Sequence, residues 1–403
     1  MPLDQILLAR QPIYNPAKSV IGYELLFRSE VAPEKFDGNL ATSQVLLNAY
    51  TESTIEEVTG GQKAFVNFTR ELLLQPPPFS PEHLTIEILE DIEPDAAVLA
   101  AVADLKRKGF TLAMDDYVPG TRSDAFLPFV DIVKLELPAI AESRLPEVIR
   151  QLKQQQKKLL AEKIETHEEF QRCVDLGCDM FQGYFLSKPQ VVKGRKLPQN
   201  KMAVMQLIAT MQNPALSIAQ VIDIITRDPS LAFKLLQLVN SAAFRRSRKI
   251  ESIHMAVMML GISRIKAWAT LLALTGMDDK PAILVNFALT RARMCELLAQ
   301  SLEPEAADAY FTIGLFSCLE AFFDLPVAEI LQKLPLEERI TDALTRMKGK
   351  PGLALHTTIQ YERCNLEGIH WSLLKRFALS PTDISHIYQQ CIQWLNEQDL
   401  PKS

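Results

Sequence analysis

The chain has 403 residues, of which 48% are hydrophobic and 23% are charged, with a formal net charge of −6. This length predicts two or three domains with sizeable cores, and the acidic balance argues against a protein that binds polyanions by general charge attraction. The six cysteines form no Cys-x-x-Cys pair, so they indicate neither a zinc site nor a redox motif. The sequence shows no signal peptide and no apolar run of the ~20 residues that span a bilayer. We therefore expect a cytoplasmic protein without a membrane segment.

Residues 5–188 alternate short apolar runs with helical stretches. The runs predict eight strands, at 7–14, 19–28, 63–69, 84–90, 111–117, 132–137, 159–165 and 180–187. A turn signal at 15–18 joins the first two strands as an antiparallel hairpin. Between later strands, 94–108 has helical spacing and ends at a glycine, while Thr166 and Glu169 form a capping box for another helix. The pattern predicts a (β/α)8 TIM-like barrel, an α/β fold whose first strand is antiparallel.

The chain changes character near residue 190. Residues 188–200 hold prolines, a glycine and basic residues with few apolar positions, which is typical of a linker. Beyond this segment the strand patterns vanish, and helices are expected at 202–211, 217–226, 230–240, 253–260 and 264–275, with more to Trp394. We expect three parts: an α/β domain at 1–190, a linker at 191–200 and an all-helical domain at 201–403.

Polar side chains that suit metal or phosphate chemistry stand within or directly after the predicted strands. In chain order they are Glu24, Asn67, Glu87, Glu90, Asp115, Asp116, Lys134, Glu162 and Gln182. A barrel gathers the ends of its strands around one pocket. Converging carboxylates repel one another and stay ionised only if cations lie between them, and hard divalent cations prefer oxygen ligands. The sequence therefore predicts a site for Mg²⁺ or Mn²⁺.

Taken in order, these motifs resemble the EAL domain family, whose active members hydrolyse the bacterial second messenger cyclic di-GMP to linear pGpG. The family signature stands here as Glu24-Leu25-Leu26 with Arg28, and the opening motif as Arg10-Gln11-Pro12-Ile13. Further matches are Asn67, Glu87 with Glu90, Asp115-Asp116, Lys134, Glu162, Glu165, Gln182-Gly183-Tyr184 and Lys188-Pro189.

The second half is similar to the HDOD domain, a helical relative of HD phosphohydrolases. The matching positions include Asp228-Pro229, Asn240-Ser241-Ala242 and Leu260-Gly261, and no His-Asp pair occurs in the chain. Metal chemistry is therefore not expected in this half. The combination resembles the YuxH group of EAL–HDOD signalling proteins.

The resemblance implies a role for each matched residue of the first half. Metal ligands would be Glu24, Asn67, Glu87, Asp115 and Asp116, catalytic residues would be Lys134, Glu162 and Glu90, and the substrate would be bound by Gln11, Arg28, Glu136, Gln182 and Pro189. Two ions about 4 Å apart would share a hydroxide aimed in line at phosphorus. The resemblance also implies cyclic di-GMP as the ligand, a homodimer of barrels, and a protein partner that docks on the HDOD domain.

Two positions depart from the family pattern. The family loop Asp-Asp-Phe-Gly-x-Gly is here Asp115-Asp116-Tyr117-Val118-Pro119-Gly120, a stiffer segment, and Glu136 replaces the aspartate of a Lys-x-Asp motif. The alternative function is a catalytically silent adaptor that acts through ligand binding or protein contacts. Lys134 also has a structural alternative, as a buried ion-pair partner. A nucleic-acid role rests only on the basic run 245–249, which is more typical of a solvated loop.

Overall fold

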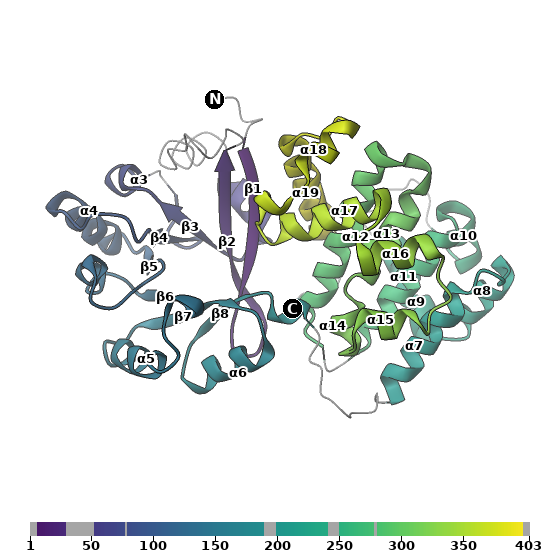
Figure 1. Ribbon diagram of the computed structural model, residues 1–403, viewed down its shortest axis with the longest axis horizontal. Helices are drawn as coiled ribbons and strands as arrows, with labels where there is room; N and C mark the ends of the chain where they lie inside the picture. Colours follow the sequence, from purple (N-terminus) through teal and green to yellow (C-terminus); the bar gives the residue numbers. More distant parts are fainter. Residues whose placement is uncertain are drawn as a thin grey trace. The chain divides into compact units, whose positions relative to one another are not determined.

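The chain forms two compact units (Figure 1). The computed structural model describes residues 6–29, 52–76, 79–188, 199–240, 250–277 and 280–397. The first unit comprises Met1–Phe185 with the short stretches Glu362–Cys364 and Pro381–His386, and the second comprises the remainder. The first boundary, after Phe185, lies just ahead of the predicted linker.

The first unit is built on a closed barrel of eight strands that neighbour one another in chain order. The first two strands form an antiparallel hairpin, the first also pairs antiparallel with the eighth, and the second to the eighth run parallel. This confirms the expected barrel with an antiparallel first strand. The strands are β1 Ile6–Tyr14, β2 Val20–Ser29, β3 Lys63–Phe68, β4 Leu84–Ile88, β5 Thr111–Met114, β6 Ile132–Glu136, β7 Lys158–Ile164 and β8 Met180–Gly183.

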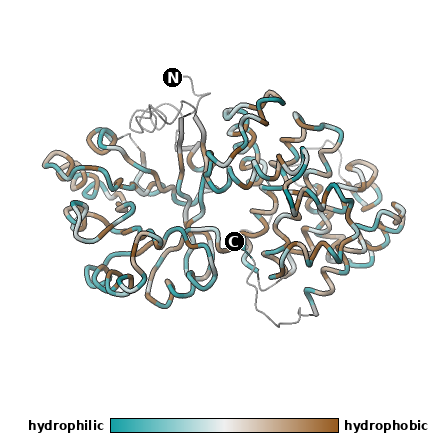
Figure 2. Tube along the Cα trace, viewed as in Figure 1, coloured by the Kyte–Doolittle hydropathy of each residue, from teal (hydrophilic) through white to brown (hydrophobic). Residues whose placement is uncertain are grey.

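Helices connect the parallel strands and lie outside them (Figure 1). Local signals set their ends: Thr166 and Glu169 form the expected capping box, and the carboxylate of Asp95 accepts a hydrogen bond from the Val98 amide at 2.9 Å. Figure 2 shows these helices as alternating hydrophilic and hydrophobic segments, as amphipathic helices on a sheet require. The helices are α2 Glu52–Thr59, α3 Arg70–Leu74, α4 Ala96–Arg107, α5 Leu145–Gln154 and α6 His167–Asp175.

The interior of the barrel is layered, because alternate residues of a strand face the same side. The middle layer is a buried apolar cluster of Ile13, Phe65, Ala113, Ile132, Leu160 and Met180. Two residues further along the parallel strands stand Asn67, Asp115, Lys134, Glu162 and Gln182. On β1, which runs the other way, Gln11 precedes Ile13 by the same step. The apolar layer thus separates a polar layer, at the C-terminal ends of the parallel strands, from the opposite mouth.

The second unit is all-helical in its described residues, which confirms the expected fold class. Its core includes Trp268, which is fully buried against Phe311 and Trp394. The remaining helices of the chain are α7 Gln199–Gln212, α8 Ile218–Thr226, α9 Pro229–Val239, α10 Ile253–Leu260, α11 Ile262–Thr275, α12 Ile283–Leu302, α13 Ala307–Phe316, α14 Leu319–Phe323, α15 Val327–Leu331, α16 Glu338–Arg346, α17 Gly349–Glu362, α18 Trp371–Leu374 and α19 Pro381–Asn396. The last residue of α17 and the first six residues of α19 belong to the first unit. The basic run 245–249 lies outside the described residues.

One helical stretch of this unit, Pro304–Phe323, is long and apolar enough to cross a membrane by length and composition. Within it, 67% of the most apolar window is buried inside the structure. The core helix of a folded domain meets the same criteria, so this stretch is weak evidence for a membrane span.

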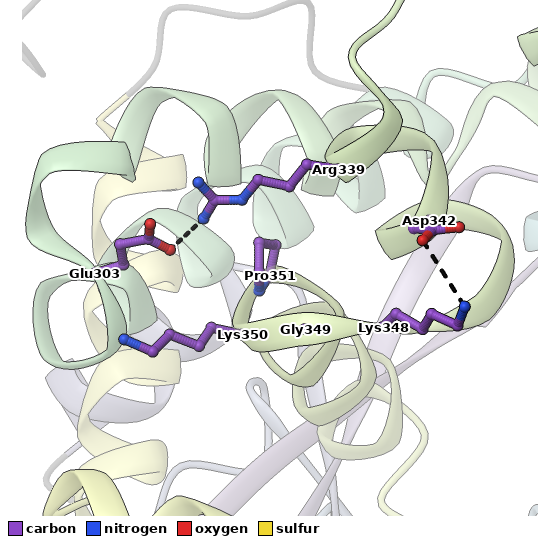
Figure 3. Close-up of a pocket in the computed structure, with 7 residues that line it drawn as sticks. All are labelled: Glu303, Arg339, Asp342, Lys348, Gly349, Lys350 and Pro351. Carbon is purple, nitrogen blue, oxygen red and sulfur yellow. Dashed lines mark hydrogen bonds and ion pairs between the residues drawn. The ribbon is translucent and has the colours of Figure 1, made fainter.

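A small pocket of about 270 Å³ lies where α17 begins (Figure 3). Its basic groups are already engaged with neighbours. Arg339 pairs with Glu303, Lys348 Nζ lies 3.9 Å from a carboxylate oxygen of Asp342, and Lys350 Nζ donates to a backbone carbonyl oxygen at 2.9 Å. The pocket therefore offers little uncompensated charge.

Candidate active site

The side chain of Lys134 stands at the centre of the polar layer and is only 1% exposed. Its Nζ atom lies 2.7 Å from Asp115 Oδ1, 2.9 Å from Glu87 Oε1, 3.1 Å from Glu162 Oε1 and 3.5 Å from Glu24 Oε1. These groups come from β2, β4, β6 and β7 and from the residue that follows β5. The barrel therefore brings together five predicted site residues that span 139 positions of the sequence, from 24 to 162.

The charges of this cluster do not balance, since four carboxylates surround one ammonium group. Burial raises the pKa of Glu87 well above its ordinary value, and the Glu24 and Asp115 carboxylates add to the rise. Burial likewise raises the pKa of Glu162 to about 8. Burial alone would lower the pKa of Lys134, but the carboxylates, led by Glu24, outweigh it and raise that pKa. The site therefore binds protons or additional cations readily.

The donor set fits a hard divalent cation. Asp115, Asp116 and Glu162 each offer an oxygen atom, and these atoms lie within 4.8 Å of one another. Asn67 Oδ1 and Glu87 Oε2 are buried and have no hydrogen-bond partner among the described residues. Carboxylate and amide oxygens are the ligands that Mg²⁺ and Mn²⁺ prefer. The residues present could therefore hold such an ion.

Asp116, one of these donors, is held in an unusual backbone conformation with a φ of 38°. Burial raises its pKa to about 6, with Asp115 and Glu136 contributing. A raised pKa of this kind is expected for a carboxyl group at a cation site that holds no cation, because nearby negative charges disfavour its ionised form.

A chain of amide hydrogen bonds borders the acidic cluster. Gln182 Nε2 donates to Glu24 Oε2 at 2.6 Å and to Gln11 Oε1 at 2.8 Å. Gln11 Nε2 in turn donates to the Tyr184 hydroxyl at 2.7 Å. Gly183 makes this turn possible: its φ is +151°, and a Cβ atom there would lie 2.0 Å from the Ile164 carbonyl oxygen. The sequence placed Tyr184 in a motif but gave no reason for its contact with Gln11.

The altered loop after Asp116 is anchored to the barrel. Tyr117 is buried, its amide donates to the Lys134 carbonyl at 3.1 Å, and its hydroxyl donates to Asp124 Oδ1 at 2.7 Å. The Gly120 amide donates to the other carboxylate oxygen of Asp124 at 3.1 Å. These bonds give the loop one defined path, with Val118 exposed at its tip.

Four of the predicted site residues lie apart from the central cluster or cannot be placed in it. Glu90 follows β4 and is exposed. Glu136 forms an ion pair with Lys163 at 2.7 Å rather than with Lys134. Arg28 belongs to β2, but its side chain lies outside the described part of the structure, as does Pro189.

Comparisons with known proteins assign both halves of the chain. The EAL domain family matches residues 51–189, and the HDOD domain family matches residues 197–335. The EAL match begins after the β1–β2 hairpin, although the structure closes the barrel with that hairpin.

Two curated proteins are similar over most of their length. YuxH of Bacillus subtilis is 33% identical over 353 residues, which cover 84% of this chain and 86% of YuxH. The cyclic di-GMP phosphodiesterase CdgJ of Vibrio cholerae is 31% identical over 377 residues, which cover 91% of this chain and 87% of CdgJ. Among solved structures, an EAL domain protein from Listeria monocytogenes is 23% identical, covers 45% of this chain and 87% of its own, and has a TM-score of 0.38. The chain therefore belongs to the family of proteins in which an EAL domain is followed by an HDOD domain.

Proposed function

We propose that this protein hydrolyses cyclic di-GMP to linear pGpG in the cytoplasm, with Mg²⁺ or Mn²⁺ as its cofactor. The observation that carries the proposal is the unbalanced cluster around Lys134, where oxygen donors suited to divalent ions meet at one mouth of the barrel. The similarity to CdgJ, a cyclic di-GMP phosphodiesterase, supports the same reaction. The six cysteines are free thiols, which is consistent with a reducing compartment.

Five residues would hold the ions: Glu24, Asn67, Glu87, Asp115 and Asp116. Bound ions would supply Lewis acidity at phosphorus and a lowered pKa for the attacking water. The protein's own groups would complete the reaction around them.

Lys134 would stabilise negative charge that develops on the phosphoryl group, since its ammonium is buried and already oriented. Glu162, whose Oε1 lies 3.1 Å from Lys134 Nζ, would accept the proton of the attacking water, because Lys134 and bound cations would together keep its carboxylate ionised. Gln182 and Gln11 would orient the substrate through the amide chain, with Glu136, Arg28 and Pro189 at its edges. Glu90 would act from outside the cluster, through the anchored loop.

The second candidate is a catalytically silent adaptor that binds cyclic di-GMP and acts through protein contacts of its HDOD domain. The defined path of the Tyr117–Gly120 segment favours it, because a loop held by Asp124 has less freedom to adjust a neighbouring carboxylate. A homodimer of barrels would use this same loop, with Val118 at the contact.

An assay of the full chain with cyclic di-GMP, run once with Mn²⁺ and once with a chelator, tests the proposal. Chromatography measures the pGpG that each reaction forms. Glu87→Gln keeps the shape of a fully buried ligand and should lower turnover about 100-fold or more. Glu147→Gln, on the exposed surface of α5, is the matched control and should leave turnover unchanged. Binding measured by calorimetry without turnover would favour the adaptor. If the protein neither binds nor hydrolyses cyclic di-GMP, both functions are rejected.

A further inference from the structure

The barrel has a second opening, at the N-terminal ends of the parallel strands and across the apolar layer from the acidic cluster. A pocket of about 600 Å³ lies there, lined by the first residues of β3 and β5 to β8 and by the loops that precede them. Sites for small molecules commonly have volumes of about 300–1,000 Å³. None of the residues that line this pocket belongs to the acidic cluster.

The charge of this opening is the reverse of that at the acidic cluster. Four lysines and one aspartate line it: Lys63, Lys106, Lys157, Lys158 and Asp131. Lys106 pairs with Asp131, and Lys157 Nζ donates to a backbone carbonyl at 2.8 Å. The ammonium groups of Lys63 and Lys158 make neither an ion pair nor a hydrogen bond within the part of the chain that the structure describes. This distinguishes the opening from the pocket of Figure 3, whose basic groups are engaged.

The strand register explains why these two lysines line the opening. Lys63 precedes Phe65 by two residues on β3, and Lys158 precedes Leu160 by two residues on β7. Phe65 and Leu160 belong to the inward-facing apolar layer, and alternate residues of a strand face the same side. The two lysines therefore flank the mouth from strands that are four places apart in the barrel.

The floor of the pocket combines an apolar surface with one unsatisfied polar group. Phe65, Ile132 and Met180 of the apolar layer line it. Thr85 also lines it, is only 1% exposed, and its Oγ1 atom has no hydrogen-bond partner among the described residues. A buried hydroxyl without a partner is destabilising, and an acceptor atom of a ligand would relieve this cost.

We propose that the N-terminal mouth of the barrel binds a small organic phosphate. Lys63 and Lys158 would hold the phosphate, because an excess of three positive charges along the lining matches a dianion. A flat apolar body would lie against Phe65, Ile132 and Met180, and one acceptor atom would take the hydrogen bond of Thr85. This site needs no metal ion and is separate from the proposed hydrolysis.

Calorimetric titration of the full chain with adenosine 5′-monophosphate tests the proposal, in buffer with a chelator so that the acidic mouth carries no divalent ion. Adenosine and inorganic phosphate are the partial probes, and each should bind more weakly than the nucleotide. The double variant Lys63→Gln/Lys158→Gln should weaken nucleotide binding about tenfold or more, since it removes two charge-assisted contacts. Arg107→Gln/Lys108→Gln removes the same charge from exposed positions outside the pocket and should change the affinity less than about twofold.

Thr85→Val separates ligand binding from folding. Valine keeps the shape of the side chain and deletes the unsatisfied hydroxyl, so the melting temperature should stay the same or rise while nucleotide affinity falls several-fold. Absence of nucleotide binding by the unsubstituted protein, or equal affinity in the double lysine variant, would overturn the proposal. Loss of cyclic di-GMP turnover has no bearing on this result, because the titration contains no metal.

Discussion

Replacing Lys134 with methionine should destabilise the barrel in a manner that depends on pH and on metal. Methionine has a similar length and no charge, so the substitution removes the ammonium and leaves the volume nearly filled. Glu24, Glu87, Asp115 and Glu162 would then face one another without the cation that lies 2.7–3.5 Å from them in the structure.

The size of the effect follows from burial and from the number of acids that share this one cation. Removing one partner of a buried ion pair costs about 3–5 kcal/mol, and Lys134 is only 1% exposed. At about pH 8 we expect a loss of about 4 kcal/mol, which lowers the melting temperature of a unit of this size by about 8–16 °C. At about pH 5 the carboxylates of the variant take up protons, so the loss should shrink to less than about 2 kcal/mol.

Thermal unfolding followed by near-ultraviolet circular dichroism, at both pH values and with chelator or Mn²⁺, measures these losses. Mn²⁺ should restore most of the stability at the higher pH, because the ion supplies the missing positive charge. Lys153→Met is the control: its Nζ lies 2.8 Å from Asp179, but both side chains are 36% exposed, so its loss should stay below about 1 kcal/mol. Equal losses for Lys134→Met at both pH values, untouched by Mn²⁺, would refute the reasoning.

Three other predictions concern the pH profile and substitutions at three glycines. In the metal-free protein the pKa of Glu162 is about 8 against an ordinary 4.5, so between these pH values the folded state holds a proton that the unfolded state releases. The free energy of unfolding should therefore fall as pH rises from about 4.5 to 8. Urea titrations that show it rising over this range would contradict the raised pKa. Gly183→Ala should lower both stability and turnover strongly, because its Cβ would meet a β7 carbonyl at 2.0 Å. Gly120→Ala, with a φ of +80° and open space around it, should cost only about 1–2 kcal/mol. Equal effects of the two substitutions in a melting assay would show that the contact of the added Cβ atom with β7 does not matter. Gly314→Ala should loosen the contact of α13 with α12, since its Cβ would lie 2.3 Å from the Arg291 carbonyl, and hydrogen exchange of these helices should accelerate; unchanged exchange would reject the steric argument.

The barrel could be predicted because its strands are short apolar runs bounded by turn and cap signals. The run predicted at 63–69 is β3 Lys63–Phe68, and the run predicted at 159–165 is β7 Lys158–Ile164. Parallel strands covered on both faces leave such runs in any sequence of this class. The convergence of Glu24, Glu87 and Asp115 at one mouth followed from the same pattern, and the ion pairs of Lys134 show it. The chemical roles of these residues stay predictions.

The contacts between the converging side chains could not be predicted, because they depend on the relative register of strands that are far apart in the chain. Lys134 was expected either to stabilise phosphate charge or to serve as a buried ion-pair partner, and it contacts four carboxylates at once. The hydrogen bond between Gln182 and Gln11 joins residues 171 positions apart. No local pattern distinguishes Lys63 and Lys158 from solvated lysines at strand starts, since only closure of the sheet brings them to one opening.

The opposite polarity of the two barrel ends predicts an order in which ligands bind at the acidic one. With one ammonium among four carboxyl groups, that end should disfavour a phosphodiester until cations have bound there. We therefore expect cations to enter first, and a large excess of nucleotide should not substitute for them. Solution concentrations of free Mg²⁺ or Mn²⁺ would thus decide whether this end of the protein senses nucleotides at all, while the lysine-lined end attracts anions whatever the metal supply.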